Sequence, residues 1–304
     1  MKVFLKDIIH QEALEKLKEN TEIIDDWEQI GEADAIIVRR IRLDADIYEK
    51  CPRLKVIGFH GSGIGGIDLQ GAREHQVQVF TVPGENAQSV AELNIALALD
   101  VAHMVTFAAH EIKNGKKMKN ALDRFVGCEL WKKTAGIMGM GHIGKLTAQK
   151  LKAGFDMDII GYSKDFTKQE AESLGVKKAA TREEVLKQSD FVFLALPYST
   201  ETHHFIDSQE LKMMRRNSIL INTARGNLIN EDALLNALES HTIAGAACDV
   251  FSKEPLDLEH PLMRMERFVP TPHIGGNTEE ALYRVGMGVV NGILERMEKM
   301  QNEK

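Results

Sequence analysis

Short apolar runs separated by amphipathic segments recur along residues 1–85 of this chain. Four runs, at residues 3–5, 36–38, 56–57 and 77–82, have the length and apolar content of buried strands. Residues 12–19, between the first two runs, instead place their apolar side chains on one face of a helix. Strands that alternate with helices in this way predict a parallel sheet covered by helices.

Residues 89–109 form the most apolar stretch, and Ser89 is the expected N-cap at its start. The stretch is long enough to raise the question of a membrane span. It carries four polar or charged side chains, Glu92, Asn94, Asp100 and His103. We therefore expect one long helix buried at a domain or subunit contact, and no membrane association.

From residue 134 the alternation repeats with clearer strands. Six are predicted, at residues 135–138, 158–162, 191–196, 218–222, 243–247 and 268–270. Helical patterns lie between them, including residues 209–214 and 231–239, and a last helix at residues 278–300 could return to the first domain. Six strands alternating with helices are typical of a complete Rossmann domain.

The run Gly139-Met140-Gly141-His142-Ile143-Gly144 joins the strand at 135–138 to a helical pattern. This is the context that the dinucleotide-binding fingerprint GxGxxG requires. The first glycine permits a tight turn, the second lets a pyrophosphate approach the backbone, and the third permits close packing of helix on strand. The N-terminus of the helix then faces the phosphate charge. The run therefore predicts a dinucleotide site.

A second GxGxxG run, at residues 61–66, also follows a strand-like segment. The segment after it is short and is interrupted by Gly71, so no long helix follows. The fingerprint alone is a weak signal, and the context favours the run at 139 as the dinucleotide site.

The length of 304 residues suits two domains better than one core. We expect a discontinuous domain at residues 1–90 and 280–304, with a dinucleotide-binding domain at residues 91–279 inserted into it. The formal net charge of −7 argues against nonspecific nucleic-acid binding. The three cysteines have no metal-binding spacing and no signal peptide is recognisable, so we expect reduced thiols and a cytoplasmic location.

Several runs, taken in order, resemble the D-isomer-specific 2-hydroxyacid dehydrogenases, which include glyoxylate/hydroxypyruvate reductases and phosphoglycerate dehydrogenases. They lie at residues 54–68, 83–92, 129–134, 196–197, 221–226, 245–251, 254–255 and 271–276. The resemblance covers nearly the whole chain. It implies an α/β fold in which a Rossmann-type doubly wound parallel sheet domain is inserted into a smaller flavodoxin-like α/β substrate-binding domain, and a homodimer.

The resemblance assigns the chemistry to Arg225, Glu254 and His273, and these residue types suit it. A guanidinium can pair with the carboxylate of a 2-oxo acid and polarise its ketone. Hydride delivery to the ketone carbon leaves an alkoxide that needs a proton, which an imidazolium can supply. A neighbouring carboxylate favours the charged imidazole. The implied function is NAD(P)H-dependent reduction of a small 2-oxo acid to the D-2-hydroxy acid.

Each of the three residues also has a structural interpretation, as a strand-end cap, a solvated loop acid or a loop histidine. Their joint position at the C-terminal ends of predicted strands favours the catalytic interpretation. His203 and His204 have no carboxylate or cysteine partner at ligand spacing, so we expect no metal site.

For the run at 61, the resemblance implies a loop that holds the substrate carboxylate through backbone amides at Ser62 and Gly63. Relatives often carry an aspartate where this chain has Gly65, and the effect of that difference on the loop is open. Arg39 matches a position that contacts substrate in some relatives. With Arg40 and Arg42 it could bind a second anionic group or form a solvated loop.

The cofactor preference depends on the end of the strand at residues 158–162. An acidic residue normally binds the ribose hydroxyls of NAD there, but this chain has Ser163 followed by Lys164. This change favours NADP (NADPH) over NAD, although Asp165 could reach the ribose after a shift of one or two residues. The other implied cofactor contacts are Gly139, Gly141, His142, Ile143, Gly144, Pro197, Thr202, Thr223, Ala224, Arg225, Asp249, His273 and Gly275.

The substrate remains open among hydroxypyruvate, glyoxylate and branched 2-oxo acids. A 3-phosphoglycerate dehydrogenase is an alternative, although we expect no regulatory extension of the kind found in its long forms. Formate dehydrogenases replace the catalytic glutamate with glutamine, so Glu254 argues against that activity. A nucleotide-sensing, corepressor-like binding protein on the same fold would retain the histidine and glutamate, and only turnover distinguishes it.

Overall fold

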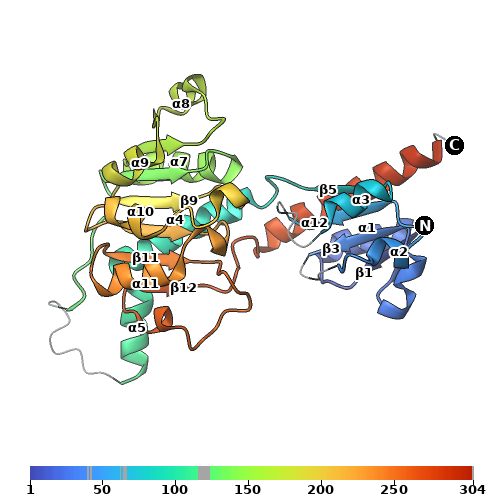
Figure 1. Cartoon of the computed structure of the whole chain (residues 1–304), viewed down its shortest axis with the longest axis horizontal. Coiled ribbons are helices and arrows are strands. Elements are labelled where there is room, and N and C mark those ends of the chain that lie inside the picture. Colours follow the sequence, from blue (N-terminus) through green and yellow to red (C-terminus); the bar gives the residue numbers. More distant parts are fainter. Residues whose placement is uncertain (40, 42, 62, 64–66, 116–123, 303–304) are drawn as a thin grey trace. The chain divides into compact units, whose positions relative to one another are not determined.

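The structure is a computed structural model that describes residues 1–39, 41, 43–61, 63, 67–115 and 124–302. Contacts divide the chain into two compact units, Met1–Ser89 with Gly276–Lys304, and Val90–Gly275 (Figure 1). Each unit is built on one parallel β-sheet.

The sheet of the first unit has the strand order β2-β1-β3-β4-β5, which is the flavodoxin-like order that the resemblance implies. Its strands are β1 (Lys2–Leu5), β2 (Glu22–Ile24), β3 (Ala35–Val38), β4 (Val56–Phe59) and β5 (Gln78–Thr81). Its helices are α1 (Gln11–Asn20), η1 (Trp27–Glu32), α2 (Ile47–Lys50), α3 (Leu69–Glu74) and α12 (Glu279–Asn302).

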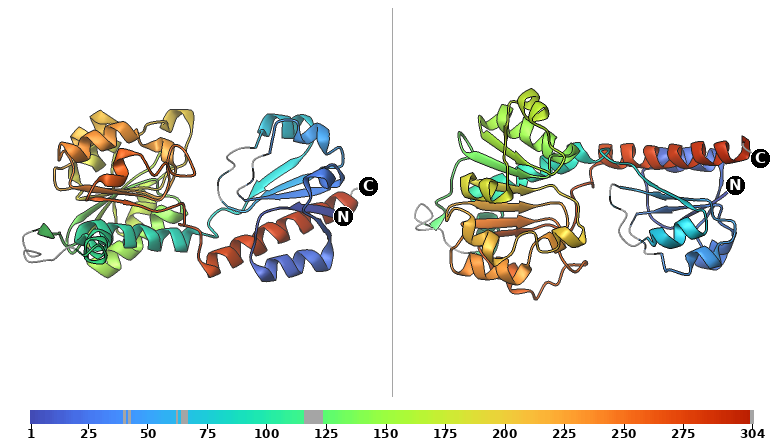
Figure 2. Two further views of the ribbon diagram at one scale, coloured as in Figure 1. Left: turned by 90° about the horizontal axis from the view of Figure 1, so that it is seen from below. Right: turned by 45° about the horizontal axis from the view of Figure 1, so that its top comes forward.

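Helices cover both faces of this sheet. On one face α1 and α12 lie side by side (Figure 2), where Leu17 and Ile293 are buried in the same cluster as Ile37 of β3. On the other face η1, α2 and α3 contribute Ile30, Tyr48 and Ala72 to a second cluster. The last helix therefore belongs to the first unit, as the sequence predicted.

The sheet of the second unit has the order β8-β7-β6-β9-β10-β11-β12, a Rossmann order with one further strand. Its strands are β6 (Thr134–Met138), β7 (Asp158–Tyr162), β8 (Lys177–Lys178), β9 (Phe191–Leu194), β10 (Ile219–Asn222), β11 (Gly245–Cys248) and β12 (Phe268–Pro270). All six predicted strands are present, with ends that differ by no more than two residues.

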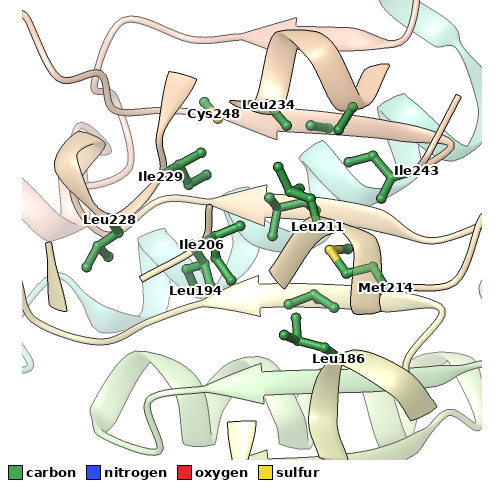
Figure 3. Close-up of a cluster of buried hydrophobic side chains, with 14 of the residues drawn as sticks. Leu186, Leu194, Ile206, Leu211, Met214, Leu228, Ile229, Leu234, Ile243 and Cys248 are labelled. Carbon is green, nitrogen blue, oxygen red and sulfur yellow. The ribbon is translucent and has the colours of Figure 1, made fainter. Parts of the chain in front are cut away.

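The helices of the second unit bury one apolar cluster on each face of the sheet. Figure 3 shows one of them, in which Leu186, Leu211 and Leu234 project from three helices onto the strands. The helices, in chain order, are α4 (Ala87–His103), α5 (Val105–Lys113), α7 (His142–Phe155), α8 (Lys168–Leu174), α9 (Arg182–Gln188), η2 (Thr200–Thr202), α10 (Ser208–Met213), η3 (Gly226–Leu228), α11 (Glu231–Glu239) and η4 (Pro261–Arg264).

Two short strands were not predicted from the sequence, and both lie at a sheet edge. β2 is three residues long and β8 is a pair of exposed lysines. An edge strand of this length gives no apolar run, because its side chains are not enclosed on both faces.

The prediction of one helix over residues 89–109 is wrong. The helix begins at Ala87, so Ser89 is a buried residue inside it, and Met104, at φ of +57°, separates α4 from α5. A left-handed residue cannot continue a helix, and apolar periodicity does not reveal it. Within the described residues no single helix meets the length and hydropathy criteria for a membrane span, whereas α4 and α5, bent by 62°, meet them only as a pair.

The close contact between α7 and β6 yields a first prediction. A Cβ on Gly144 would lie 1.9 Å from the Gly139 carbonyl oxygen, so Gly144→Ala is expected to lower the free energy of unfolding by at least about 2 kcal/mol. Gly154 lies in the same helix with no atom within 4 Å of its Cβ position. Gly154→Ala is expected to raise stability by about 0.5–1 kcal/mol, because alanine favours the helix. Urea unfolding of both variants checks this, and equal effects would contradict it.

Candidate active site

The turn between β6 and α7 has the geometry that the glycine run predicts. Gly139 has φ of +100°, and a Cβ there would lie 2.4 Å from the Ala195 carbonyl carbon. Gly141 precedes the helix, with no atom within 4 Å of its Cβ position, and His142 and Ile143 open α7. The N-terminal N–H groups of a helix and open space beside its first turn fit a pyrophosphate.

Ser163 and Lys164 directly follow β7, as predicted. The Lys164 ammonium is ion-paired with Glu201, which raises the pKa of Lys164 and lowers that of Glu201. Both side chains are exposed, at 76% and 73%. The positive charge beside Ser163 is therefore present, but an acid from the loop after β9 balances it.

The loop after β9 is held by the hydroxyl of Thr202. Its Oγ1 donates to the Pro197 carbonyl oxygen at 3.0 Å and accepts from the Ser199 N–H at 2.7 Å. Pro197 and Thr202 were both predicted as cofactor contacts. These hydrogen bonds show that they belong to one local structure.

Arg225 lies in a turn that follows β10. Asn222, the last residue of the strand, holds this turn: its Oδ1 accepts from Ala224 N at 3.0 Å and its Nδ2 donates to the Arg225 carbonyl oxygen at 2.9 Å. Desolvation lowers the pKa of Arg225, and the charge of Glu254 opposes that shift. Asn222 was not among the site residues predicted from the sequence, although a polar residue at the end of an apolar strand was an available signal.

His273 and Glu254 come together as predicted, with 2.8 Å between His273 Nδ1 and Glu254 Oε2. Glu254 Oε1 also accepts from the Phe251 N–H at 3.2 Å. An ionised carboxylate only accepts hydrogen bonds, so Nδ1 is the protonated nitrogen and Nε2 is left to exchange a proton. The pair is half-exposed, at 50% for His273 and 39% for Glu254, and solvent can reach it.

Glu254 remains ionised in this arrangement. Desolvation raises its pKa, but the hydrogen bond and charge of His273, the Phe251 N–H and Arg225 together lower the pKa below its ordinary value. Because the folded-state pKa is lowered, the stability that the pair contributes is present above the ordinary glutamate pKa of 4.5. That contribution is lost as the pH falls through the folded-state value.

Asp249 supports the segment that carries His273. Its buried carboxylate accepts from Thr271 Oγ1 at 2.6 Å, Ile274 N at 2.8 Å and Gly275 N at 2.8 Å. Between these contacts His273 has φ of +55°, a conformation that non-glycine residues rarely adopt. Asp249 was predicted from the sequence only as a cofactor contact, and the structure adds this support of the histidine.

The first unit carries the remaining predicted residues. Arg39 follows β3, and its guanidinium donates to the Ile8 carbonyl oxygen at 2.7 Å and to Asn277 Oδ1 at 3.0 Å. Gly63 follows β4. Four further residues of the sequence analysis, Ser62, Gly65, Arg40 and Arg42, lie outside the described residues.

His60, at the end of β4, yields a prediction on stability. It is 7% exposed, its Nε2 has no hydrogen-bond partner among the described residues, and burial together with the charge of Arg39 lowers its pKa to about 4. The unfolded chain takes up a proton near pH 6.5 but the folded chain does not, so stability is full above that pH and falls by about 3 kcal/mol towards pH 4. Urea unfolding between pH 7.5 and 4 should show a shallower fall in His60→Gln. Equal slopes would contradict this prediction.

All the predicted residues of the second unit follow the C-terminal ends of parallel strands, the edge at which α/β sheets bind ligands. Direct contact joins Glu254 to His273, whereas Ser163 and Thr202 belong to separate loops. Within the described residues no group of three or more His, Cys, Asp or Glu side chains could hold a metal ion.

Residues 95–275 match the sequence profile described as "D-isomer specific 2-hydroxyacid dehydrogenase, NAD binding domain". The chain belongs to this family. The match lies in the second unit, so the glycine turn and the strand ends described above belong to the NAD-binding domain of a D-2-hydroxyacid dehydrogenase.

Individual relatives support the same assignment. D-3-phosphoglycerate dehydrogenase of Methanocaldococcus jannaschii is 36% identical over 302 residues, which cover 96% of this chain but 57% of that protein. Hydroxypyruvate reductase of Thermotoga maritima is 36% identical over an alignment that covers 95% of this chain and 93% of that protein. The crystal structure of the TT0316 protein from Thermus thermophilus has a TM-score of 0.89 and 31% identity to this chain. The superposition covers 98% of this chain and 97% of that one.

Proposed function

We propose that this protein reduces a small 2-oxo acid to the D-2-hydroxy acid, using NADPH in preference to NADH. The observation that carries the proposal is the hydrogen bond between His273 and Glu254 on the sheet edge that also bears Arg225 and the glycine turn. Relatives named hydroxypyruvate reductase and glyoxylate reductase support it.

The cofactor, when bound, supplies a hydride to the ketone carbon of the substrate. Arg225 pairs with the substrate carboxylate and polarises the carbonyl. His273 gives the proton on Nε2 to the former carbonyl oxygen, while Nδ1–H stays bonded to Glu254. The ionised Glu254 fixes the orientation of the ring through this hydrogen bond.

The test is NADPH and NADH oxidation by the purified protein with a panel of 2-oxo acids: hydroxypyruvate, glyoxylate, branched 2-oxo acids and 3-phosphohydroxypyruvate. Turnover with at least one acid and a D-configured product are expected. Cofactor binding without turnover of any acid would overturn the proposal and favour a nucleotide-sensing binding protein.

A 3-phosphoglycerate dehydrogenase is the second candidate. Arg39 after β3 and the relatives of that name support it. A kcat/KM for 3-phosphohydroxypyruvate that exceeds the value for hydroxypyruvate would favour this candidate, since the two acids differ only in the phosphate.

The cofactor preference can be tested at Ser163, after β7. Ser163→Asp is expected to lower the ratio of kcat/KM for NADPH to that for NADH about tenfold, because a carboxylate repels the 2′-phosphate and binds the ribose hydroxyls. Ser173→Asp is the matched control, since it adds the same charge on the exposed face of α8. An unchanged ratio in Ser163→Asp would contradict the role of this strand end.

A homodimer and a cytoplasmic location are further parts of the proposal. Three apolar side chains, Val105 and Ile112 of α5 and Val126 before β6, are exposed and would be covered by a partner subunit. All three cysteines are free thiols, which suits a reducing compartment. Light scattering measures the mass in solution, and a monomer at micromolar concentration would contradict the dimer.

A further inference from the structure

Asn94 is a polar residue on the buried side of an apolar helix. It is 0% exposed and lies one turn before Leu97 and Ala98 and two turns before Val101, which pack into the second unit's core. Its amide makes two hydrogen bonds to other elements: Nδ2 donates to Thr147 Oγ1 at 3.1 Å, and Oδ1 accepts from Thr223 Oγ1 at 2.8 Å. Both threonines are buried as well.

The two partners of Asn94 belong to the two functional parts of the NAD-binding domain. Thr147 lies in the second turn of α7, the helix that the glycine turn opens. Thr223 follows β10 and begins the turn that carries Arg225. Asn222 holds the other end of this turn through the Arg225 carbonyl oxygen. One buried amide therefore connects the cofactor-binding helix to the arginine turn.

We propose that Asn94 is a positioning residue for Arg225: it fixes the Thr223–Arg225 turn relative to α7, and so orients the guanidinium towards the substrate. The inference rests on the proposed function. Hydrogen bonds in a buried site are directional and strong, whereas an apolar side chain of similar size would fill the space without fixing the turn. A displacement of about 1 Å in a group that orients substrate can cost up to about 100-fold in rate.

The competing explanation is that the network only satisfies buried polar atoms. In that case a variant would lose stability, but the molecules that remain folded would keep their kinetic constants. The kinetic constants of folded protein, measured well below the unfolding temperature of each variant, therefore decide between the two.

The experiment compares four variants of the full chain. Asn94→Leu removes the amide, and Thr147→Val removes one of its partners but keeps the side-chain shape. Thr147→Ser keeps the hydroxyl and is the conservative control. Ser189→Ala removes another fully buried hydroxyl, which donates to the Val185 carbonyl oxygen at 2.6 Å and precedes β9, at the amino-terminal ends of the strands.

Asn94→Leu is expected to lower kcat/KM for the oxo acid at least about tenfold, and Thr147→Val about threefold or more, with the dissociation constant of NADPH changed less than about threefold. Thr147→Ser and Ser189→Ala are expected to stay within about twofold of the parent protein. If Asn94→Leu does not fold, the Thr147 pair decides.

Kinetic constants of Asn94→Leu or Thr147→Val equal to those of their controls, or an equal loss in Ser189→Ala, would overturn the inference while leaving the proposed function intact. Absence of turnover in the parent protein would overturn the proposed function, and the inference with it.

Discussion

Replacing His273 with glutamine is expected to lower kcat for the oxo acid by about 100- to 10,000-fold, because the glutamine amide can donate a similar hydrogen bond to Glu254 but cannot deliver a proton. The hydrogen bond to Glu254, and the support of the segment by Asp249, hold the ring in one orientation. The dissociation constant of NADPH should change far less than kcat, because His273 is only one of the implied cofactor contacts. Initial rates and cofactor titration measure the two effects separately.

His241→Gln is the matched control for this variant. His241 is also a non-glycine residue with positive φ, at +52°, and is exposed. It follows α11 and precedes β11, so it does not lie at the C-terminal end of a strand. Its replacement should leave kcat within about twofold, so any effect of the unusual backbone conformation is accounted for. A His273→Gln variant with near-normal kcat would exclude the histidine as the proton donor.

Arg225 is the second position at which a large loss is expected. Arg225→Gln should lower kcat/KM about 1000-fold, and Arg225→Lys about 100-fold, because lysine retains the charge but not the planar pair of donors that matches a carboxylate. Asn222 and Thr223 hold the turn through its backbone and neighbouring side chains, so both variants should fold. Kinetics with the best oxo acid, together with thermal unfolding, check the prediction.

Arg215→Gln controls for the loss of an arginine charge. Arg215 precedes β10, at the opposite end of that strand from the Arg225 turn, and is ion-paired with Asp190 at 3.0 Å. Its replacement is expected to change kcat/KM less than about twofold. An equal loss in Arg215→Gln and Arg225→Gln would show that net charge, and not the position of Arg225, controls turnover.

Much of the fold follows from local patterns in the sequence. The strand runs predicted every strand of the NAD-binding domain except the two-residue β8, because strands buried on both faces must be continuously apolar. The glycine run predicted the turn at Gly139, since its φ of +100° is accessible only to glycine without strain. The left-handed break at Met104 was not predicted, because no side-chain pattern requires it.

The candidate site, too, could be predicted only in part from the sequence. Arg225, Glu254 and His273 could be predicted because each lies in a short run that resembles a known family and each follows a strand. The roles of the residues that orient them could not be predicted, because the hydrogen bonds of Asn222, Asn94 and the Thr271 hydroxyl depend on which elements pack together. The ion pair of Lys164 with Glu201 joins loops 37 residues apart and changes the charge balance that the strand end alone implied.

The sequence by itself determined the two sheets, the dinucleotide turn and the residue types available at the strand ends, because these depend on periodicity and on backbone conformations of single residues. Only the tertiary structure decided which atoms meet. The protonated nitrogen of His273, the support by Asp249 and the buried amide of Asn94 all depend on hydrogen bonds between elements distant in the chain. Such bonds form where burial makes an unpaired polar group costly, and burial is a property of the packed fold.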